Sequence, residues 1–212
     1  DTLGCAGNPV VKTPNLDQLA GDGIRFTQNC VTTAICGVSR ASLFTGQWMS
    51  RHGNEGFQMF KTPWKQTYPG LLRSNGYYVG HIGKWHNGSQ WPYHPMARGF
   101  DTYFGHTSGH WGEYFDAPLE QDGKMIRTKG YIVDVCTDRA LAFIDENKEK
   151  PFFCYVPFTT PHSPWAAPEK DWARMKNLSI TQRATEAGKE VADETRCALA
   201  MMENQDMNVG RV

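Results

Sequence analysis

Five side chains with the chemistry to bind and cleave an anionic ester lie in three short segments of the sequence. Cys36 and Arg40 lie in ICGVSRASLFTG, Lys84 and His86 in GKWHNG, and His162 in TTPHSPW. Arginine and lysine supply positive charge that can hold a tetrahedral oxyanion, and histidine can exchange a proton near neutral pH. The cysteine occupies the position of a nucleophile. Together these residue types predict a site for a negatively charged ester, and their spacing leaves sulfate and phosphate open.

The local sequence around Cys36 strengthens this interpretation. Residues 38–45 are predicted to be helical and Gly46 ends the helix, so Cys36 lies just before a helix N-terminus, where unpaired N–H groups favour an anion. Two other interpretations of the cysteine remain open. It can be a small core residue, as free cysteines commonly are. A thiol protease or transferase would use it with a histidine, but would leave Arg40 and Lys84 without a role.

Helix and strand patterns alternate along the chain, which predicts an α/β fold with a largely parallel sheet. Helices are predicted within 12–23, 38–45, 67–76, 131–147 and 191–208, and strands within 24–30, 77–83 and 151–158. Each reactive segment follows a predicted strand, and ligands of open α/β sheets bind at the carboxyl ends of strands. We therefore expect the three segments to converge there.

A loop-rich region of about residues 87–129 contains many Gly, Pro, His and aromatic residues and shows little periodicity. Loops of this length in a compact domain are usually functional or disordered. His94, His106, His110 and Trp111 are the candidates for a substrate-binding cleft wall, with His110 and Trp111 the preferred pair. Gly105 and Gly109 disfavour a helix that would place two of these histidines on one face as zinc ligands.

Composition excludes several other classes of protein. The 212 residues contain 22 Lys and Arg against 22 Asp and Glu, so no basic surface for nucleic acid is indicated. The longest apolar runs are too short to span a membrane. Six cysteines without a CxxC pair argue against a zinc ribbon or a thioredoxin-like motif, and leave the redox compartment open.

The motifs, taken together, resemble those of the formylglycine-dependent (type I) sulfatase family, within the alkaline-phosphatase-like superfamily. The resemblance covers essentially the whole chain. The matching segments are NPVVKTPNLDQLAGDGIRFTQNC, CGVSRASLFTG, SNGYYVGHIGKWHNG, RGFDTYFG, PFFCYVPFTTPHSPW and NVGRV. One departure lies in the second segment, where Val38 stands at a position that is usually proline.

The resemblance implies an alkaline-phosphatase-like α/β fold, with a mostly parallel mixed sheet flanked by helices. It implies that residues 1–212 form a single catalytic domain that is incomplete at both ends, an internal fragment of the N-terminal part. The family's paired aspartates would precede Asp1, and its Asp-Asn metal pair and a second sulfate-binding lysine would follow Val212. We therefore expect the fragment alone to be inactive.

The implied reaction is sulfate ester hydrolysis through a formylglycine made from Cys36. The hydrated aldehyde is a geminal diol: one hydroxyl attacks sulfur, and the other later expels sulfate and regenerates the aldehyde. By resemblance, Arg40 steadies the diol, Lys84 binds sulfate oxygens, His86 assists the expulsion step, and His162 lies beside the ester oxygen and protonates the leaving group.

The resemblance also implies a cofactor and partners. Calcium is expected, with Cys36, as formylglycine, among its ligands and the other ligands outside this chain. The expected partners are a sulfated small molecule or glycan and a formylglycine-generating or sulfatase-maturating enzyme, and the expected location is periplasmic or extracellular. Two alternatives remain: a non-catalytic homologue that binds sulfated glycans, and a phosphate or phosphonate ester hydrolase of the same superfamily.

Overall fold

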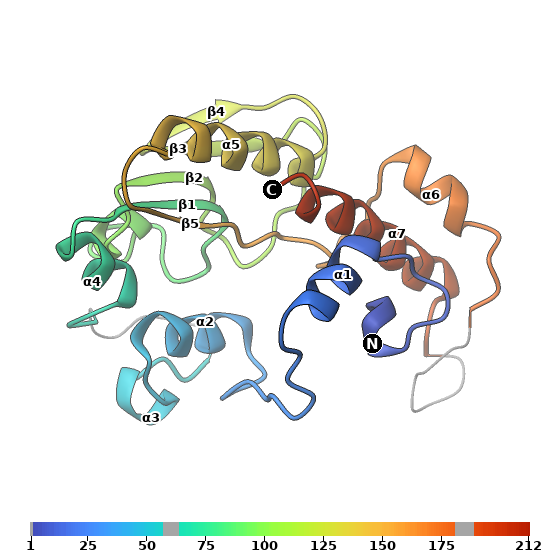
Figure 1. The fold of residues 1–212 in the computed structure, drawn as a ribbon, viewed down its shortest axis with the longest axis horizontal. Helices are drawn as coiled ribbons and strands as arrows, with labels where there is room; N and C mark the ends of the chain where they lie inside the picture. The colour runs from blue at the N-terminus through green and yellow to red at the C-terminus, as the bar shows by residue number, and fades with distance from the viewer. Residues whose placement is uncertain (1, 57–63, 181–188) are drawn as a thin grey trace. The chain divides into compact units, whose positions relative to one another are not determined.

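A computed structural model of the chain describes residues 2–56, 64–180 and 189–212 and divides it into two compact units (Figure 1). Unit 1 comprises Asp1–Thr27 and Thr159–Val212, and unit 2 comprises Gln28–Phe158. Each unit has an apolar core of its own. Among the helices of the described residues, none combines the length and the hydrophobicity needed to cross a membrane.

Unit 2 is built on a five-stranded sheet with the strand order β4-β3-β2-β1-β5. The strands are β1 (Tyr78–Lys84), β2 (Thr102–His106), β3 (Pro118–Gln121), β4 (Lys124–Arg127) and β5 (Phe152–Tyr155). β1 lies between β2 and β5 and runs parallel to both, whereas β3 and β4 continue the sheet in antiparallel fashion. The prediction of an α/β fold with a mostly parallel mixed sheet flanked by helices is confirmed.

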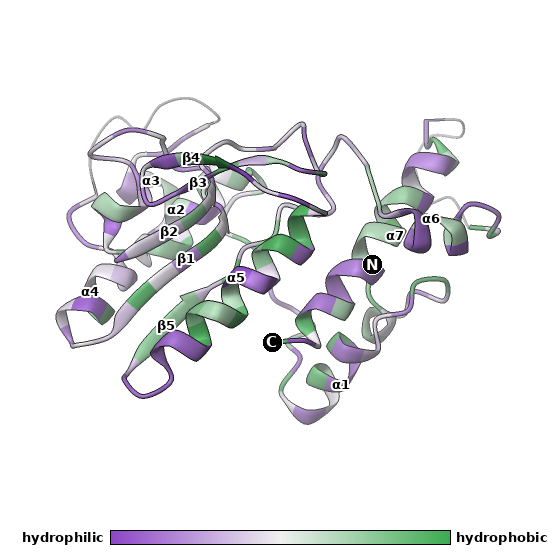
Figure 2. Ribbon diagram, turned by 90° about the horizontal axis from the view of Figure 1, so that it is seen from above, coloured by the Kyte–Doolittle hydropathy of each residue, from purple (hydrophilic) through white to green (hydrophobic). Residues whose placement is uncertain are grey.

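Helices flank this sheet. They are α2 (Cys36–Thr45), α3 (Met49–His52), α4 (Tyr68–Ser74) and α5 (Ile132–Asn147), with a 3-10 turn η2 (Pro95–Arg98). α5 lies along β1 and β5, and apolar segments of this helix and of β1 are visible in Figure 2. Phe143 of α5 stacks on Tyr78 of β1 at 5.8 Å between ring centroids. The apolar spacing predicted for 131–147 therefore produces the helix that covers the sheet.

An aromatic cluster attaches α2 to the sheet. Phe44 of α2 is fully buried, and its ring centroid lies 4.8 Å from that of Trp85 and 5.5 Å from that of Tyr155. Trp85 directly follows β1 and Tyr155 ends β5. Such ring contacts add to the free energy gained by burying apolar surface. They fix α2, and the residues at its N-terminus, against the ends of the neighbouring strands β1 and β5.

His81 occupies the middle of this cluster. Its ring lies 5.0–5.5 Å from those of Phe100, Tyr103, Tyr155 and Trp85. Among the described residues neither of its ring nitrogens has a hydrogen-bond partner. Burial lowers the pKa of His81 well below 6.5, and the charge of Arg40 adds to the effect. The ring is therefore neutral and packs as an aromatic residue.

Unit 1 consists of α1 (Pro14–Asp22), α6 (Glu169–Met175) and α7 (Ala192–Val209), with a 3-10 turn η1 (Gly4–Ala6). Asp206 of α7 accepts hydrogen bonds from the backbone N–H groups of Asn15 and Leu16, at 3.2 and 2.8 Å. These donors belong to the first turn of α1, which has no intrahelical acceptor for them. One buried carboxylate thus joins two helices that are far apart in sequence.

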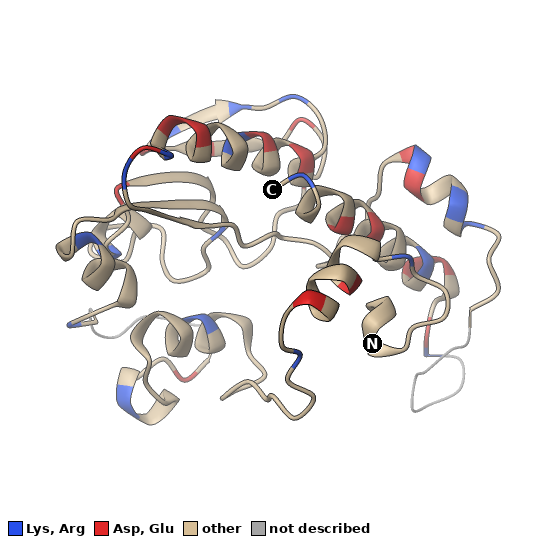
Figure 3. Cartoon of the chain, viewed as in Figure 1, with Lys and Arg blue, Asp and Glu red and all other residues tan. Residues whose placement is uncertain are grey.

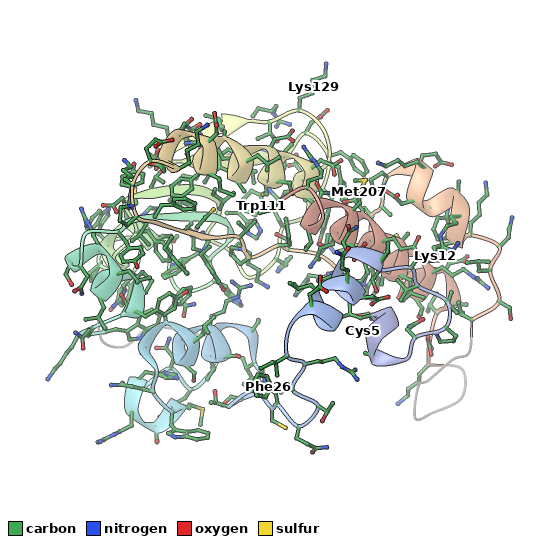
Figure 4. The ribbon with its side chains drawn as sticks, in the orientation of Figure 1. Cys5, Lys12, Phe26, Trp111, Lys129 and Met207 are labelled. Atoms are coloured by element: carbon green, nitrogen blue, oxygen red, sulfur yellow. The ribbon has the colours of Figure 1, made fainter. Side chains whose placement is uncertain are left out.

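Two predictions about elements need correction. Residues 24–30 do not form a strand, although their polar–apolar alternation predicts one. Ile24 and the labelled Phe26 of Figure 4 are 83% and 76% exposed, so the apolar face of the alternation is not buried. The region 87–129 contains β2, β3 and β4 as well as loops. β2 is buried at every position, so it lacks the alternation that would reveal a half-buried strand.

Phe44 provides a test of the aromatic cluster. We expect Phe44→Ala to lower the free energy of unfolding by about 3–5 kcal/mol, because it removes a fully buried ring from a close-packed core. Leu43 is 54% exposed, so Leu43→Ala is a matched control on the same helix and should cost well under about 1 kcal/mol. Denaturant unfolding measures both values. Equal losses would show that the cluster does not hold α2.

His81 makes stability depend on pH. The unfolded chain binds a proton at this ring near pH 6.5 and the folded chain does so only at much lower pH, so acidification favours unfolding. We expect stability to fall as the pH drops below 6.5, and His81→Phe to reduce that slope by up to about 1.4 kcal/mol per pH unit. Denaturant unfolding between pH 7 and pH 5, where the slope is read, measures this. An unchanged slope would contradict the assignment.

Candidate active site at the carboxyl end of β1

Cys36 is the first residue of α2 and is partly exposed. The preceding residue, Ile35, has extended backbone and its side chain makes no capping hydrogen bond. Val38 and Ala41 are fully buried and, with Phe44, form the apolar face that orients the helix. The N-terminal turn therefore presents backbone N–H groups beside the thiol, as the sequence predicts.

Arg40, which is half-buried, and Lys84, which is buried, place two cations near Cys36. Arg40 Nη1 donates a 2.7 Å hydrogen bond to the backbone carbonyl of Lys84, the last residue of β1. Burial lowers the pKa of both side chains, their mutual repulsion lowers that of Lys84 further, and the sulfur of Cys36 acts in the opposite direction. No carboxylate of the described residues pairs with either cation. An anionic ligand would supply the missing countercharge.

His86 is positioned by a change of backbone direction after β1. Its N–H donates to the carbonyl of Thr107 at 3.2 Å, which extends the β1–β2 pairing, and its φ of 59° then turns the chain. The ring lies between two glycines. A Cβ on Gly109 would lie 2.4 Å from His86 Nε2, and one on Gly37 would lie 3.8 Å from Cε1. Glycine at position 109 therefore leaves room for the imidazole, and the contact with Gly37 places His86 beside the residue that follows Cys36.

His106, His110 and Trp111 line the neighbouring part of β2 and its following loop. His106 is opposite Lys84 in the parallel register and stacks on Trp111, labelled in Figure 4, at 5.1 Å. Burial, followed by the charges of Lys84 and Arg40, lowers the pKa of His106 to about 3. It is therefore neutral near pH 7. His110 is exposed and close enough to contribute to that lowered pKa.

His94, which the sequence suggested as part of the wall of a substrate-binding cleft, is instead a buried structural residue. It is buried, and its Nε2 lies 2.7 Å from Oε1 of Glu120. Its Nδ1 accepts a hydrogen bond from the N–H of Met96. These contacts make His94 a structural residue that joins η2 to β3 and not an exposed wall of a cleft.

His162 belongs to unit 1. Its Nδ1 lies 2.7 Å from the carbonyl oxygen of Ser163, and because a carbonyl can only accept, Nδ1 carries the hydrogen. Thr160 Oγ1 donates to Gln205 of α7 at 2.7 Å and holds this loop. Cys36, Arg40, Lys84 and His86 are brought together within unit 2. The convergence of His162 with them stays a prediction.

A hydrogen-bonded serine and histidine on α2 and α3 were not anticipated. His52 Nε2 lies 2.9 Å from Ser42 Oγ, a distance found in nucleophile–base pairs. The N–H of Asn54 donates to His52 Nδ1, so in the neutral ring Nε2 carries the hydrogen and donates to Ser42. Such a histidine cannot remove the serine proton. The hydrogen bond between Ser42 and His52 joins α2 to α3. In the sequence, the RHG segment at residues 51–53 was the signal that could have drawn attention to this histidine.

The residues of this chain were also tested as a metal site. Within residues 2–56, 64–180 and 189–212, no three His, Cys, Asp or Glu side chains are grouped as they would be around a metal ion. The described residues alone therefore lack a cluster of carboxylates of the kind that binds calcium.

The fold and the site define an α/β protein with two cations beside a cysteine at the carboxyl end of β1. Comparison with known proteins assigns the family. The model of the Sulfatase family matches residues 1–212, so the chain belongs to the sulfatase family. Its fold is the alkaline-phosphatase-like α/β fold that the resemblance predicts.

Relatives in this family include the N-acetylglucosamine-6-O-sulfatase of Bacteroides thetaiotaomicron, 36% identical over 77% of this chain and 28% of the relative. The solved structure of Ps i-CgsB in complex with k-i-k-neocarrahexaose matches with a TM-score of 0.84 at 29% identity, over 99% of this chain and 50% of that one. A structure described as a complex with its substrate D-glucosamine-2-N,6-O-disulfate matches with a TM-score of 0.75 at 33% identity, over 86% and 36%. The chain thus spans half or less of the length of these relatives.

The two glycines beside the loop of His110 test the placement of His86. Gly109→Ala adds a methyl group 2.4 Å from His86 Nε2, so we expect it to displace the ring and shift its NMR resonances. Gly112→Ala is the matched control, because a Cβ there has no neighbour within 4 Å among the described residues, and it should leave those resonances unchanged. Unchanged His86 resonances in Gly109→Ala would contradict this position of the ring.

Proposed function

We propose that the protein hydrolyses sulfate esters of a sulfated carbohydrate, by means of a formylglycine formed from Cys36. The observation that carries this proposal is a pair of cations, the buried Lys84 and the half-buried Arg40, beside a partly exposed cysteine at the start of a helix. Family membership supports the reaction class. The names of two relatives, which refer to a sulfated amino sugar, support the substrate class.

Lys84 and Arg40 are suited to hold a sulfate group. Their charge lies in surroundings from which water is largely excluded, where attraction to an anion is stronger than in bulk solvent. Arg40 is held by its hydrogen bond to the Lys84 carbonyl, so it does not have to be reorganised when substrate binds. Fixed charges of this kind stabilise a transition state in which negative charge develops on the ester.

Cys36 fits the position of the formylglycine. When formed, the hydrated aldehyde supplies two hydroxyl groups on one carbon, one to attack sulfur and one to release the sulfate. The chain contributes the uncapped first turn of α2 around it and the adjacent Arg40. Val38, at the usual proline position, is fully buried, so it acts in packing and leaves the exposed side of the turn unchanged.

His86, His162, His110 and Trp111 complete the proposed site. His86, next to the first turn of α2, assists release of sulfate. His162, in the form that carries a hydrogen on both ring nitrogens, gives the Nε2 proton to the leaving alcohol and becomes neutral, while Nδ1–H keeps its bond to the carbonyl of Ser163. His110 and Trp111 contact the sugar. Calcium, a sulfatase-maturating enzyme as partner and a periplasmic or extracellular location remain proposals from family resemblance alone.

Substrate preference of the full-length parent protein tests the proposal. We expect turnover of an aryl sulfate to exceed that of the matching aryl phosphate, and Cys36→Ala to abolish it. Lys84→Met should lower kcat/KM for the sulfate ester roughly 100-fold, as loss of an oxyanion-stabilising group does. It should not lower the unfolding midpoint, because it removes a buried cation that has no counterion among the described residues.

Three results would each contradict a different part of this proposal. A preference for the aryl phosphate would favour the phosphate ester hydrolase. Binding of a sulfated glycan without turnover of any ester would favour the non-catalytic homologue. Full activity of Lys84→Met would show that this lysine does not contact the sulfate group.

A further inference from the structure

A second basic cavity lies in unit 2, next to α4 and η2. Its volume is about 540 Å³, and its lining includes Trp64, Lys65, Arg73, Trp91 and Arg98. The described lining residues include three cations and no aspartate or glutamate; Arg73 has an ion-pair partner, Asp101, outside the lining, whereas no ion pair is found for Lys65 or Arg98 among the described residues. In Figure 3 basic residues mark α4 and the loop that precedes it. The composition of this cavity suggests an anionic ligand.

Arg98 is the buried cation of the cavity. It is 4% exposed, and its guanidinium lies over the rings of Trp64 and Tyr93 at 4.4 and 5.3 Å from their centroids. Among the described residues its Nε and Nη2 have no hydrogen-bond acceptor. Burial lowers its pKa to about 10. The ring contacts offset part of the cost of burying the charge, but the two N–H positions still favour an oxyanion.

Trp91 supplies a flat apolar surface at the same cavity. Its side chain is 70% exposed, and its ring stacks on His94 with 6.4 Å between centroids and an angle of 17°. The hydrogen bond from His94 Nε2 to Oε1 of Glu120 holds that histidine in place. An exposed but supported indole can stack on the apolar face of a sugar ring at little cost in side-chain entropy.

The cavity is separate from the candidate active site. Arg73 of the cavity pairs with Asp101 at 2.7 Å, and Asp101 also accepts a hydrogen bond from the N–H of Val79 near the start of β1. Lys84 lies at the other end of that strand. A strand rises about 3.3 Å per residue, so the Arg73 end of the cavity is roughly 15–20 Å from Lys84. The Arg98 end is nearer, because Trp64 beneath Arg98 packs on Trp85 with 6.3 Å between ring centroids.

We infer that this cavity is a second, non-catalytic binding pocket, which takes a sugar residue that carries an anionic group. The anionic group, a sulfate or a carboxylate, interacts with Arg98, Lys65 and Arg73, and the sugar ring stacks on Trp91. The pocket would hold a part of an anionic carbohydrate chain remote from the residue being cleaved. This inference rests on the cavity and does not require the proposed hydrolysis.

Ligand binding to the full-length protein tests this inference in a Cys36→Ala background, so that no ester is cleaved. Calorimetric titrations use matched sulfated, uronic and neutral oligosaccharides, and the indole N–H resonance of Trp91 reports on the pocket. We expect an anionic oligosaccharide to shift that resonance and the neutral one to leave it unchanged. Comparing the sulfated and uronic ligands identifies which anionic group is bound.

Substitutions of two exposed residues test the pocket without disturbing the fold. Lys65→Ala and Trp91→Ala should each weaken this binding roughly tenfold, as loss of one charged or stacking contact does. Lys129→Ala and Trp48→Ala are the controls, since both residues are exposed and lie outside the cavity, and they should leave affinity unchanged. Arg98→Lys adds a buried variant whose folding is checked by its unfolding midpoint.

The inference would be overturned if no anionic sugar shifted the Trp91 resonance, if the neutral ligand bound equally well, or if both exposed variants bound normally. Turnover of a small aryl sulfate by Trp91→Ala distinguishes this failure from failure of the proposed function. Such a substrate does not reach the second pocket, so its turnover should be unchanged whether or not the pocket binds carbohydrate.

Discussion

The hydrogen bond from Arg40 to the backbone carbonyl of Lys84 is the contact on which the proposed site depends. It joins the first turns of α2 to the last residue of β1 and so fixes two cations and Cys36 in one place. Like charges in surroundings of low polarity repel, and neither has a carboxylate partner among the described residues. Folding therefore keeps an arrangement that is electrostatically unfavourable in the absence of an anion, which is a property of binding sites.

The aromatic cluster around His81 provides the stability that this arrangement needs. Phe44 of α2 packs on Trp85, which follows β1, and on Tyr155 of β5. The apolar face of the helix is therefore buried, while Cys36 in its N-terminal turn stays partly exposed. His81 is kept neutral in the same cluster and adds no third charge near Arg40. Packing of the apolar face of α2 thus holds Cys36 in position at the N-terminus of the helix.

The sequence predicts much of this arrangement, for identifiable reasons. Gly46, Asn75 and Gly76 end helices and the apolar spacing of 131–147 is regular, so these elements follow from local sequence. The strand expected at 24–30 fails because alternation alone cannot show whether a neighbouring strand exists. The roles of Gly37, Gly109 and Arg98 depend on residues distant in sequence, which no local pattern contains. The motifs predicted Cys36, Arg40, Lys84 and His86 as a group, and the structure brings these four together.

The state of Cys36 in the mature protein is the central question. Trypsin releases residues 26–40, with Cys36 inside, from the full-length parent purified from its native host, and mass spectrometry of this peptide identifies the side chain. Our account predicts the aldehyde or its hydrate and no thiol that can be alkylated. An unmodified thiol in every copy would contradict the account, because the two cations would then hold a sulfate ester beside a residue that cannot release it.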